Sequence, residues 1–311
     1  GSDGRILEWD INQPGSDPIV LAGSLGYSRR DVAVSPDGKW LLSSSDSSQL
    51  QLFDIMNPEA GPTIIEGHKG LVYDIKPMPD GSGFLSIGFD HTLRYYDYNR
   101  SRLMKQLEYP LRSFDITDDG KWIYGGSLQG EMVRISVETM EEEVLFTSEI
   151  KEPIFSLEAS HHDPIVVFAA GDYVIRIWDM VTDQITEELY GHSARVSDID
   201  FSYNGELMAS SSWDGTVQLW YMDNLTELSI ILDDNHDSWV WDVDFSPDDK
   251  YLIVGTRDGK IKRWAVDASL YAEQLCTKIS RSMTIDEWER YVGNGIKYSS
   301  ACGAAEESED L

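Results

Sequence analysis

The sequence predicts an all-β fold in which one small antiparallel sheet is repeated around a ring, and three observations support this. Each repeat contains three short apolar runs separated by tight turns, the pattern of an antiparallel meander. The chain has 311 residues, including 10 Trp and 15 Tyr, residues that favour strands. A position in the second tight turn recurs at spacings of 43, 44, 39, 43, 42 and 44 residues, at Asp3, Asp46, Asp90, Gln129, Asp172, Asp214 and Asp258. A period near 43 residues predicts a β-propeller.

The clearest repeat spans Gly191 to Tyr221 and reads GHSARVSDIDFSYNGELMASSSWDGTVQLWY. A Gly-His pair precedes its first apolar run, and Asp214-Gly215 begins the turn before the last run, which ends at Trp220. These residues resemble the WD repeat, in which such a unit forms most of one propeller blade. The resemblance extends over nearly the whole chain before residue 280.

The resemblance implies a buried hydrogen-bond chain within the fifth repeat, formed by His192, Ser212, Asp214 and Trp220. Trp offers only an indole N–H donor, whereas His can both donate and accept, so the four groups can satisfy one another. Because buried polar groups are normally paired, we interpret this set as structural rather than as a catalytic Ser–His–Asp arrangement. The sixth repeat should hold the equivalent residues His236, Asp258 and Trp264.

The repeats predict six complete four-stranded blades. The repeats begin at Arg29, Gly67, Leu111, Ile154, Gly191 and Asn235, and their expected outer strands are Thr63–Ile65, Leu103–Glu108, Val144–Ser148, Ile185–Leu189, Ser229–Leu232 and Ala272–Thr277. The third repeat lacks the Gly-His pair and has Gln129 in place of Asp, so we expect no complete polar chain there. A partial seventh blade is expected from Arg5–Asp10 and Ile19–Ala22, with its inner strands supplied by preceding residues of a longer protein.

The end of the chain differs from the repeats. Met283–Val292 predicts a short helix, because Thr284 and Glu287 form a capping box and Trp288, Tyr291 and Val292 form one apolar stripe. This segment resembles the C-terminal tail of bacterial WD-repeat proteins that are joined to STAND-type signalling NTPases. We therefore divide the chain into a propeller (1–279), a tail docked on it (280–302) and an acidic disordered end (303–311). Docking would bring Cys302 towards Cys276, where a reduced contact is favoured over a disulfide.

The composition excludes several kinds of function. A formal net charge of −30 argues against nucleic acid and anionic membranes as partners, because both need Lys and Arg. It leaves two interpretations open, simple solubility or attraction to a basic protein partner. The absence of a signal peptide pattern and of a long apolar run favours the cytoplasm. No nucleotide-binding or metal-binding motif occurs, so we expect no cofactor and no metal.

The resemblance also implies which residues face the mouth of the central channel, on what we call the top face. They are Trp239, Trp241 and Arg257 in the sixth repeat, Arg195, Ser197 and Trp213 in the fifth, Phe155 in the fourth, Arg112 in the third, Leu71, Tyr73 and Phe89 in the second, and Arg30 in the first. Trp, Tyr and Arg dominate binding hot spots, and large exposed aromatic patches mark interaction sites.

The sequence therefore predicts a non-catalytic module that binds a protein or peptide on its top face, as the sensor or docking part of a larger bacterial signalling protein. Two alternatives stay open. One is a propeller enzyme, such as a lyase or hydrolase, and the other is a structural scaffold that uses the blade edges and sides.

Overall fold

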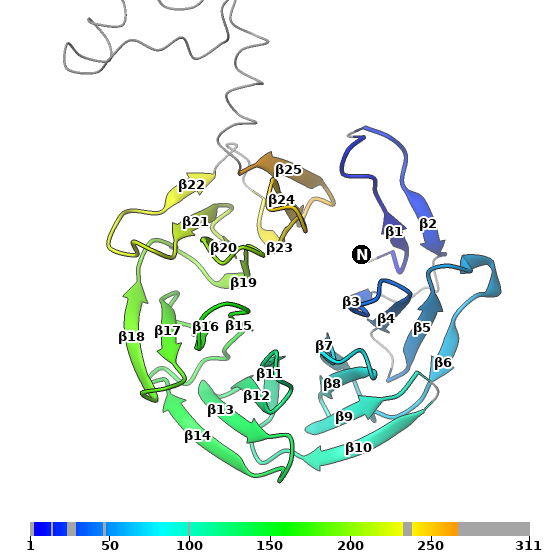
Figure 1. The fold of residues 1–311 in the computed structure, drawn as a ribbon, viewed down its shortest axis with the longest axis horizontal. Coiled ribbons are helices and arrows are strands. Elements are labelled where there is room, and N and C mark those ends of the chain that lie inside the picture. Colours follow the sequence, from blue (N-terminus) through cyan, green and yellow to red (C-terminus); the bar gives the residue numbers. More distant parts are fainter. Residues whose placement is uncertain are drawn as a thin grey trace, which may run out of the picture.

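The computed structural model describes residues 3–13, 15–23, 29–45, 48–98, 100–232 and 238–266. Figure 1 shows their strands arranged as blades around a ring, with the first strand of each blade innermost. Within each blade the strands pair antiparallel in chain order. The prediction of an all-β propeller is confirmed, and the described residues form six blades.

Blades one to three are four-stranded sheets. Blade one contains β3 (Arg29–Val34), β4 (Trp40–Ser45), β5 (Leu50–Asp54) and β6 (Thr63–Ile65), with a 3₁₀ turn at Pro58–Ala60. Blade two contains β7 (Val72–Pro77), β8 (Phe84–Gly88), β9 (Thr92–Tyr96) and β10 (Ser101–Gln106). Blade three contains β11 (Leu111–Ile116), β12 (Trp122–Ser127), β13 (Glu131–Ser136) and β14 (Glu142–Thr147).

Blades four and five also have four strands, and blade six has three in the described residues. Blade four contains β15 (Ser156–Ala159), β16 (Ile165–Ala169), β17 (Ile175–Asp179) and β18 (Gln184–Leu189). Blade five contains β19 (Val196–Phe201), β20 (Leu207–Ser212), β21 (Val217–Tyr221) and β22 (Ile230–Leu232). Blade six contains β23 (Val240–Phe245), β24 (Tyr251–Thr256) and β25 (Ile261–Ala265). The expected outer strand Ala272–Thr277, the tail helix and both cysteines lie outside the described residues.

The turn between the first and second strands is built from the same local chemistry in three blades. A serine hydroxyl accepts the backbone N–H five residues further on, at 2.9 Å in Ser35–Trp40, 2.9 Å in Ser202–Leu207 and 3.0 Å in Ser246–Tyr251. Gly38 and Gly205 adopt positive φ in these turns, a conformation that glycine reaches without strain. The Ser-x-x-Gly pattern therefore sets the strand reversal in blades one and five, and Asp249 takes the positive-φ position in blade six.

The hydrophobic core lies between neighbouring blades, because alternate strand residues face alternate blades. Leu85 and Ile87 of blade two pack with Phe114 of blade three, and all three side chains are fully buried. Between blades five and six, Ala209 packs in one cluster with Val243. Each blade thus buries its apolar faces against its neighbours, and the ring is stabilised mainly at these joints.

A separate two-stranded sheet, formed by β1 (Ile6–Glu8) and β2 (Ile19–Ala22), lies beside blade one. Its Ile6 packs against Leu41 and Phe53 of that blade. These are the residues that we expect to begin a seventh blade, which stays a proposal.

Candidate protein-binding face

The buried polar chain of blade five exists, but with a different serine from the one predicted. His192 contacts Asp214 through Nδ1 at 3.0 Å and Ser210 through Nε2 at 2.8 Å, and Trp220 donates its indole N–H to Ser210 at 2.9 Å. The choice of Ser212 was wrong because Trp220 pairs with Met208 across the sheet, which makes Ser210 the nearer hydroxyl on that face. Ser212 instead accepts the backbone N–H of Asp214 at 3.1 Å.

Blade two contains an equivalent chain that the sequence analysis missed. His68 lies 2.8 Å from Asp90 and 2.7 Å from the hydroxyl of Ser86, which in turn donates to the Tyr96 hydroxyl at 3.3 Å. Tyr96 takes the place of the usual Trp, and its phenol provides the same polar end on an aromatic ring. The Gly-His pair, followed by Asp90, was the available signal.

The other blades use different polar contacts at this position. In blade four, Asp172 forms an ion pair with Arg176 at 2.6 Å, and the buried indole N–H of Trp178 has no hydrogen-bond partner among the described residues. Phe168 stands there at the strand position that Ser210 holds in blade five. In blade six, Asp258 accepts from Thr256 and pairs with Lys260, while His236 lies outside the described residues. Trp264 lies near Lys262, whose ammonium is 6.0 Å from its ring.

A continuous ladder of stacked rings and guanidinium groups crosses the top face. Trp213 and Trp239 stack with centroids 4.2 Å apart and planes 2° from parallel. Arg195 lies over Trp213 at 4.2 Å and over Phe155 at 3.7 Å, and Arg257 lies over Trp239 at 4.1 Å. These five residues come from blades four, five and six. We call Phe155, Arg195, Trp213, Trp239 and Arg257, together with Trp241, the aromatic ladder.

Trp241 is the exposed aromatic ring of the ladder. It meets Trp213 edge-on at 5.3 Å and Trp239 edge-on at 5.9 Å, and it is 45% exposed. Edge-to-face contacts fix the orientation of a ring without covering both of its faces. Trp241 therefore presents an oriented aromatic surface to solvent.

The ladder extends towards blade two through Arg112, whose guanidinium is 5.6 Å from the Phe155 ring and 5.4 Å from the Tyr73 ring. Ser197 lies within the same region and donates to the Val240 carbonyl at 2.7 Å. The structure thus brings Tyr73 and Arg112 together with the ladder.

Phe89 and Leu71 lie apart from the ladder in their contacts. Phe89 is 59% exposed and meets His91 edge-on at 6.5 Å, and its backbone N–H donates to the Leu71 carbonyl at 2.7 Å. Within the described part of the chain, no ring contact connects Phe89 to the ladder. The side chain of Arg30 lies outside the description.

The charges on the ladder are exposed to a partner. Among the described residues, neither Arg195 nor Arg257 forms an ion pair with a carboxylate. Burial between the two rings and repulsion from Arg112 lower the pKa of Arg195, although Glu152 acts in the opposite direction. A guanidinium remains charged at any physiological pH, so both side chains can donate hydrogen bonds to an acidic group, and Arg257, which has a ring on one face only, can stack on a further aromatic ring.

The innermost strands carry a ring of carboxylates that the sequence analysis did not identify. Lys76 pairs with Glu158 at 2.8 Å and lies 3.8 Å from Asp115. On the opposite arc, burial and the charge of Asp242 raise the pKa of Asp198 well above its usual range. The sequence does contain a signal for these carboxylates, since an acidic residue recurs two or four positions after the start of each inner strand.

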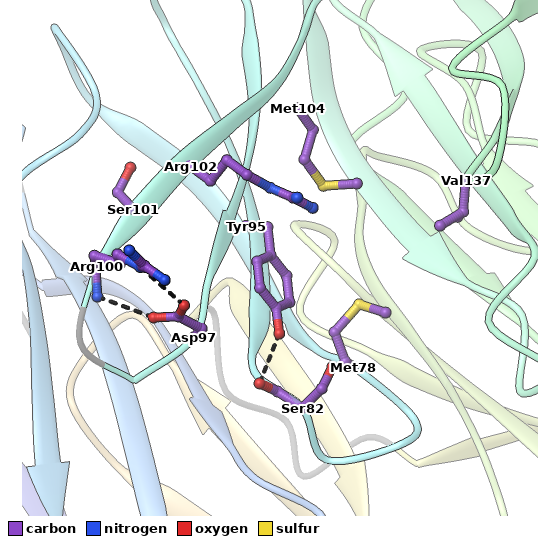
Figure 2. Close-up of a pocket in the computed structure, with 9 residues that line it drawn as sticks. All are labelled: Met78, Ser82, Tyr95, Asp97, Arg100, Ser101, Arg102, Met104 and Val137. Carbon is purple, nitrogen blue, oxygen red and sulfur yellow. Dashed lines mark hydrogen bonds and ion pairs between the residues drawn. The ribbon is translucent and has the colours of Figure 1, made fainter.

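A second surface feature lies on the side of the ring, between blades two and three. This groove has a volume of about 660 Å³, and Figure 2 shows Met78, Met104 and Tyr95 among the side chains that line it. Arg102 lies over the Tyr95 ring at 5.5 Å, and the Tyr95 hydroxyl donates to the Ser82 carbonyl at 2.7 Å. The groove is partly apolar and is remote in sequence from the ladder.

Two other features, a metal centre and a membrane-spanning helix, are absent from the described ranges. No group of three or more His, Cys, Asp or Glu side chains there is arranged to hold a metal ion. Likewise, none of the helical segments described has the length and apolar character needed to cross a bilayer.

The fold defines the class of protein, a β-propeller, and part of the chain matches WD40 repeats. Four segments, residues 20–54, 62–97, 183–221 and 227–265, match the family described as WD domain, G-beta repeat. The third blade and the first three strands of the fourth fall between these segments, and neither repeat contains the Gly-His pair.

The chain is similar in sequence to several proteins with different names. The chain is 27% identical over 222 residues to periodic tryptophan protein 2 of Arabidopsis thaliana. The aligned region covers 70% of the chain and 24% of that protein. It is 28% identical over 219 residues to the serine-threonine kinase receptor-associated protein of Gallus gallus, covering 68% of the chain and 59% of that protein. It is 24% identical over 237 residues to a WD repeat-containing protein 26 homolog of Arabidopsis thaliana, covering 73% and 39%. The aligned region thus makes up about a quarter to three fifths of these relatives.

Proposed function

We propose that the protein is a non-catalytic interaction module that binds a protein or peptide segment on its top face. The observation that carries this proposal is the aromatic ladder, in which three Trp, one Phe and two Arg from three blades form one contiguous surface. WD40 repeats supply a rigid ring on which such a surface can be held in place.

The chemistry of the ladder suits a polypeptide better than a small molecule. Trp and Arg are enriched at the centres of protein interfaces, because they bury large areas and lose few rotamers on binding. The members are already fixed by stacking before a partner arrives. Binding therefore costs less side-chain entropy than it would on a surface of loose side chains.

The charge of the chain favours a partner with a basic region. The chain carries a formal net charge of −30, and a charge of this sign speeds the encounter with a positively charged segment. The guanidinium groups of Arg195 and Arg257 then provide local contacts for carboxylates or rings on the same partner. We place no nucleic acid and no membrane among the partners.

A peptide-display selection tests this proposal. Wild-type protein should enrich a family of peptides, and the Trp239→Ala/Trp241→Ala variant should lose that family while remaining folded. Trp122→Ala is the matched control, because Trp122 is 39% exposed and follows the turn between the first two strands of its blade, at the opposite end from the ladder. Equal enrichment on wild type and the double variant would refute the top face as the binding site.

The groove between blades two and three supports a second candidate function, a scaffold that binds through blade sides. In that case the double variant would retain the selected peptides, and substitution of Tyr95 and Met104 would remove them. We find no observation that favours an enzymatic role.

We propose four further features from the sequence. They are a seventh blade begun by β1 and β2, a short docked helix at 283–292, a cytoplasmic location, and a place within a larger signalling protein. The bacterial origin proposed from the tail receives no support from the relatives described above, which are plant and animal proteins.

A further inference from the structure

The groove between blades two and three has an apolar floor to which both blades contribute. Met78 follows β7 and Met104 lies on β10, both in blade two, and Val137 follows β13 of blade three. All three side chains are half-buried and pack against the hydrophobic core that joins the two blades. Methionine side chains are flexible and polarizable, so they adapt to apolar groups of different shape. The floor can therefore take an apolar side chain from a partner.

The rim of the groove is basic, although the chain as a whole is acidic. Residues 94–106 contain four basic side chains and one acidic side chain, whereas the complete chain has 25 Lys and Arg against 55 Asp and Glu. Arg100 and Arg102 line the groove, and Asp97 is the acidic residue among its lining side chains. This rim is thus a local reversal of the charge of the protein.

Arg102 is the cation at this rim that is open to a partner. Lys105 pairs with Glu142 at 3.3 Å, and Arg100 pairs with Asp97 at 3.2 Å. Arg102 is exposed, and in the part of the chain that the structure describes its guanidinium forms no ion pair with a carboxylate. A guanidinium without a carboxylate partner, on an otherwise acidic protein, attracts an anionic group.

Tyr95 places the Arg102 guanidinium next to the apolar floor. The guanidinium lies 5.5 Å from the centroid of the Tyr95 ring, and the Tyr95 hydroxyl is fixed by its hydrogen bond to the Ser82 carbonyl at 2.7 Å. Figure 2 shows Arg102, Tyr95 and Met104 among the side chains of the same groove. A guanidinium that rests on a ring keeps the N–H donors in its plane free for two parallel hydrogen bonds to a carboxylate. An anion-binding group and an apolar site therefore adjoin.

We propose that this groove binds an acidic peptide segment of a partner protein, with an apolar side chain among its carboxylates. A carboxylate of the segment accepts hydrogen bonds from Arg102, and the apolar side chain packs against Met78, Met104 and Val137. Charge complementarity selects this occupant, because Arg102 repels a basic segment and a net charge of −30 opposes the docking of a second copy. The assignment rests on the second candidate function above, binding through blade sides, and it adds the chemistry of the partner.

The groove and the aromatic ladder share no residue, and they belong to different blades. The ladder draws on blades four to six, whereas the groove lies between blades two and three. The protein can therefore hold a basic segment on the top face and an acidic segment in the groove at the same time. Substitutions at one site should leave binding at the other unchanged.

Peptide-display selection on the full chain tests the two sites separately. A random peptide library is selected in parallel on wild type, on Arg102→Glu and on Trp239→Ala/Trp241→Ala. We expect one peptide family that Arg102→Glu loses and the double Trp variant keeps, with Asp or Glu beside an apolar residue. Absence of such a family, or a family without acidic residues, would overturn the proposal. The top face is judged by the converse family, which only the double Trp variant loses, so either site can fail alone.

Calorimetry with one peptide of that family separates its two contacts. Arg102→Glu should weaken binding by about tenfold or more, as expected for the loss of a charge-assisted contact. Lys69→Glu is the matched control, because it makes the same change of net charge at an exposed position that precedes β7, at the other end of blade two. It should leave the dissociation constant within about twofold.

The apolar contact is tested on the peptide, with the protein unchanged. Replacing the apolar residue of the peptide with serine should weaken binding by about tenfold, because the floor then covers no apolar side chain. An unchanged dissociation constant for the serine peptide would overturn the apolar half of the site. Equal losses for Arg102→Glu and Lys69→Glu would show an effect of net charge alone and would overturn the assignment of Arg102.

Discussion

Replacing Asp214 with alanine removes the acceptor at the centre of the polar chain in blade five. Its carboxylate accepts from His192 at 3.0 Å, from the Ser193 N–H at 2.9 Å and from the Thr216 hydroxyl at 2.7 Å. The His192 side chain is 1% exposed, so its stranded donor cannot be hydrated in the variant. A buried unsatisfied donor costs about 1–3 kcal/mol, and the partly covered Thr216 adds less, which predicts a loss of about 2–4 kcal/mol.

Thermal or urea unfolding measures this loss. For a domain of this size, about 3 kcal/mol corresponds to a fall in Tm of roughly 5–10 °C. Gln129→Ala is the matched control, because Gln129 holds the same turn position in blade three with an exposed side chain and only its backbone N–H bonds to Ser127. That change should alter stability by no more than about 0.5 kcal/mol. Equal shifts for the two variants would refute the structural role assigned to the chain.

The pH dependence of this difference provides an internal check. Burial alone would raise the pKa of Asp214, but the hydrogen bond and charge of His192, with the Ser193 and Thr216 donors, hold that pKa well below its usual range. A lowered carboxyl pKa contributes stability that is complete above the unfolded-state pKa and is lost as pH falls through the folded-state value. The difference between wild type and Asp214→Ala should therefore be constant near neutral pH and shrink under strongly acidic conditions.

Three further predictions concern the channel, the ladder and the partner. Burial and the charge of Asp115 raise the pKa of Glu158 to about 7, against the opposing effect of Lys76. At pH values between the ordinary glutamate pKa and about 7, the folded protein therefore binds more protons than the unfolded chain. The free energy of unfolding should then increase by about 1–3 kcal/mol as pH falls from 8 to 5, and Glu158→Gln should flatten this slope in denaturation curves; an unchanged slope would contradict the assignment. Trp241→Ala should change the melting temperature by less than about 2 °C, because an exposed substitution costs little stability, and a large fall would show that the ring is structural. Added salt should slow association with a basic peptide selected on the top face, measured by stopped-flow kinetics, and a rate independent of salt would exclude electrostatic steering.

The repeat period made the propeller predictable, because each blade must carry its own turns and apolar alternation. The limits of sequence reasoning lay in choices between neighbours. Ser210 and Ser212 share one face of β20, and only the strand register places Ser210 beside Trp220. Which of two equally suitable hydroxyls enters a hydrogen-bond chain depends on a register that composition does not encode.

The candidate site shows the same limit at longer range. Aligning the repeats predicted that Trp213, Trp239 and Arg195 lie on the same face, because the repeats place them at equivalent points on the ring. The structure brings these three side chains into contact. The same reasoning added Phe89, which is exposed but turns towards His91. The sequence did not predict the inner-strand carboxylates that join the blades. Such a carboxylate forms its hydrogen bond only when the neighbouring blade places a backbone N–H beside it.

The central claim is that the aromatic ladder binds a polypeptide, and one affinity measurement tests it most directly. The dissociation constant of the best peptide selected on wild-type protein should be measured by calorimetry for wild type, Trp241→Ala and Trp122→Ala. We predict that Trp241→Ala weakens binding by about 30-fold, equivalent to roughly 2 kcal/mol at a hot spot, while Trp122→Ala leaves it unchanged. An unchanged dissociation constant for Trp241→Ala, or an equal loss for Trp122→Ala, would contradict the account.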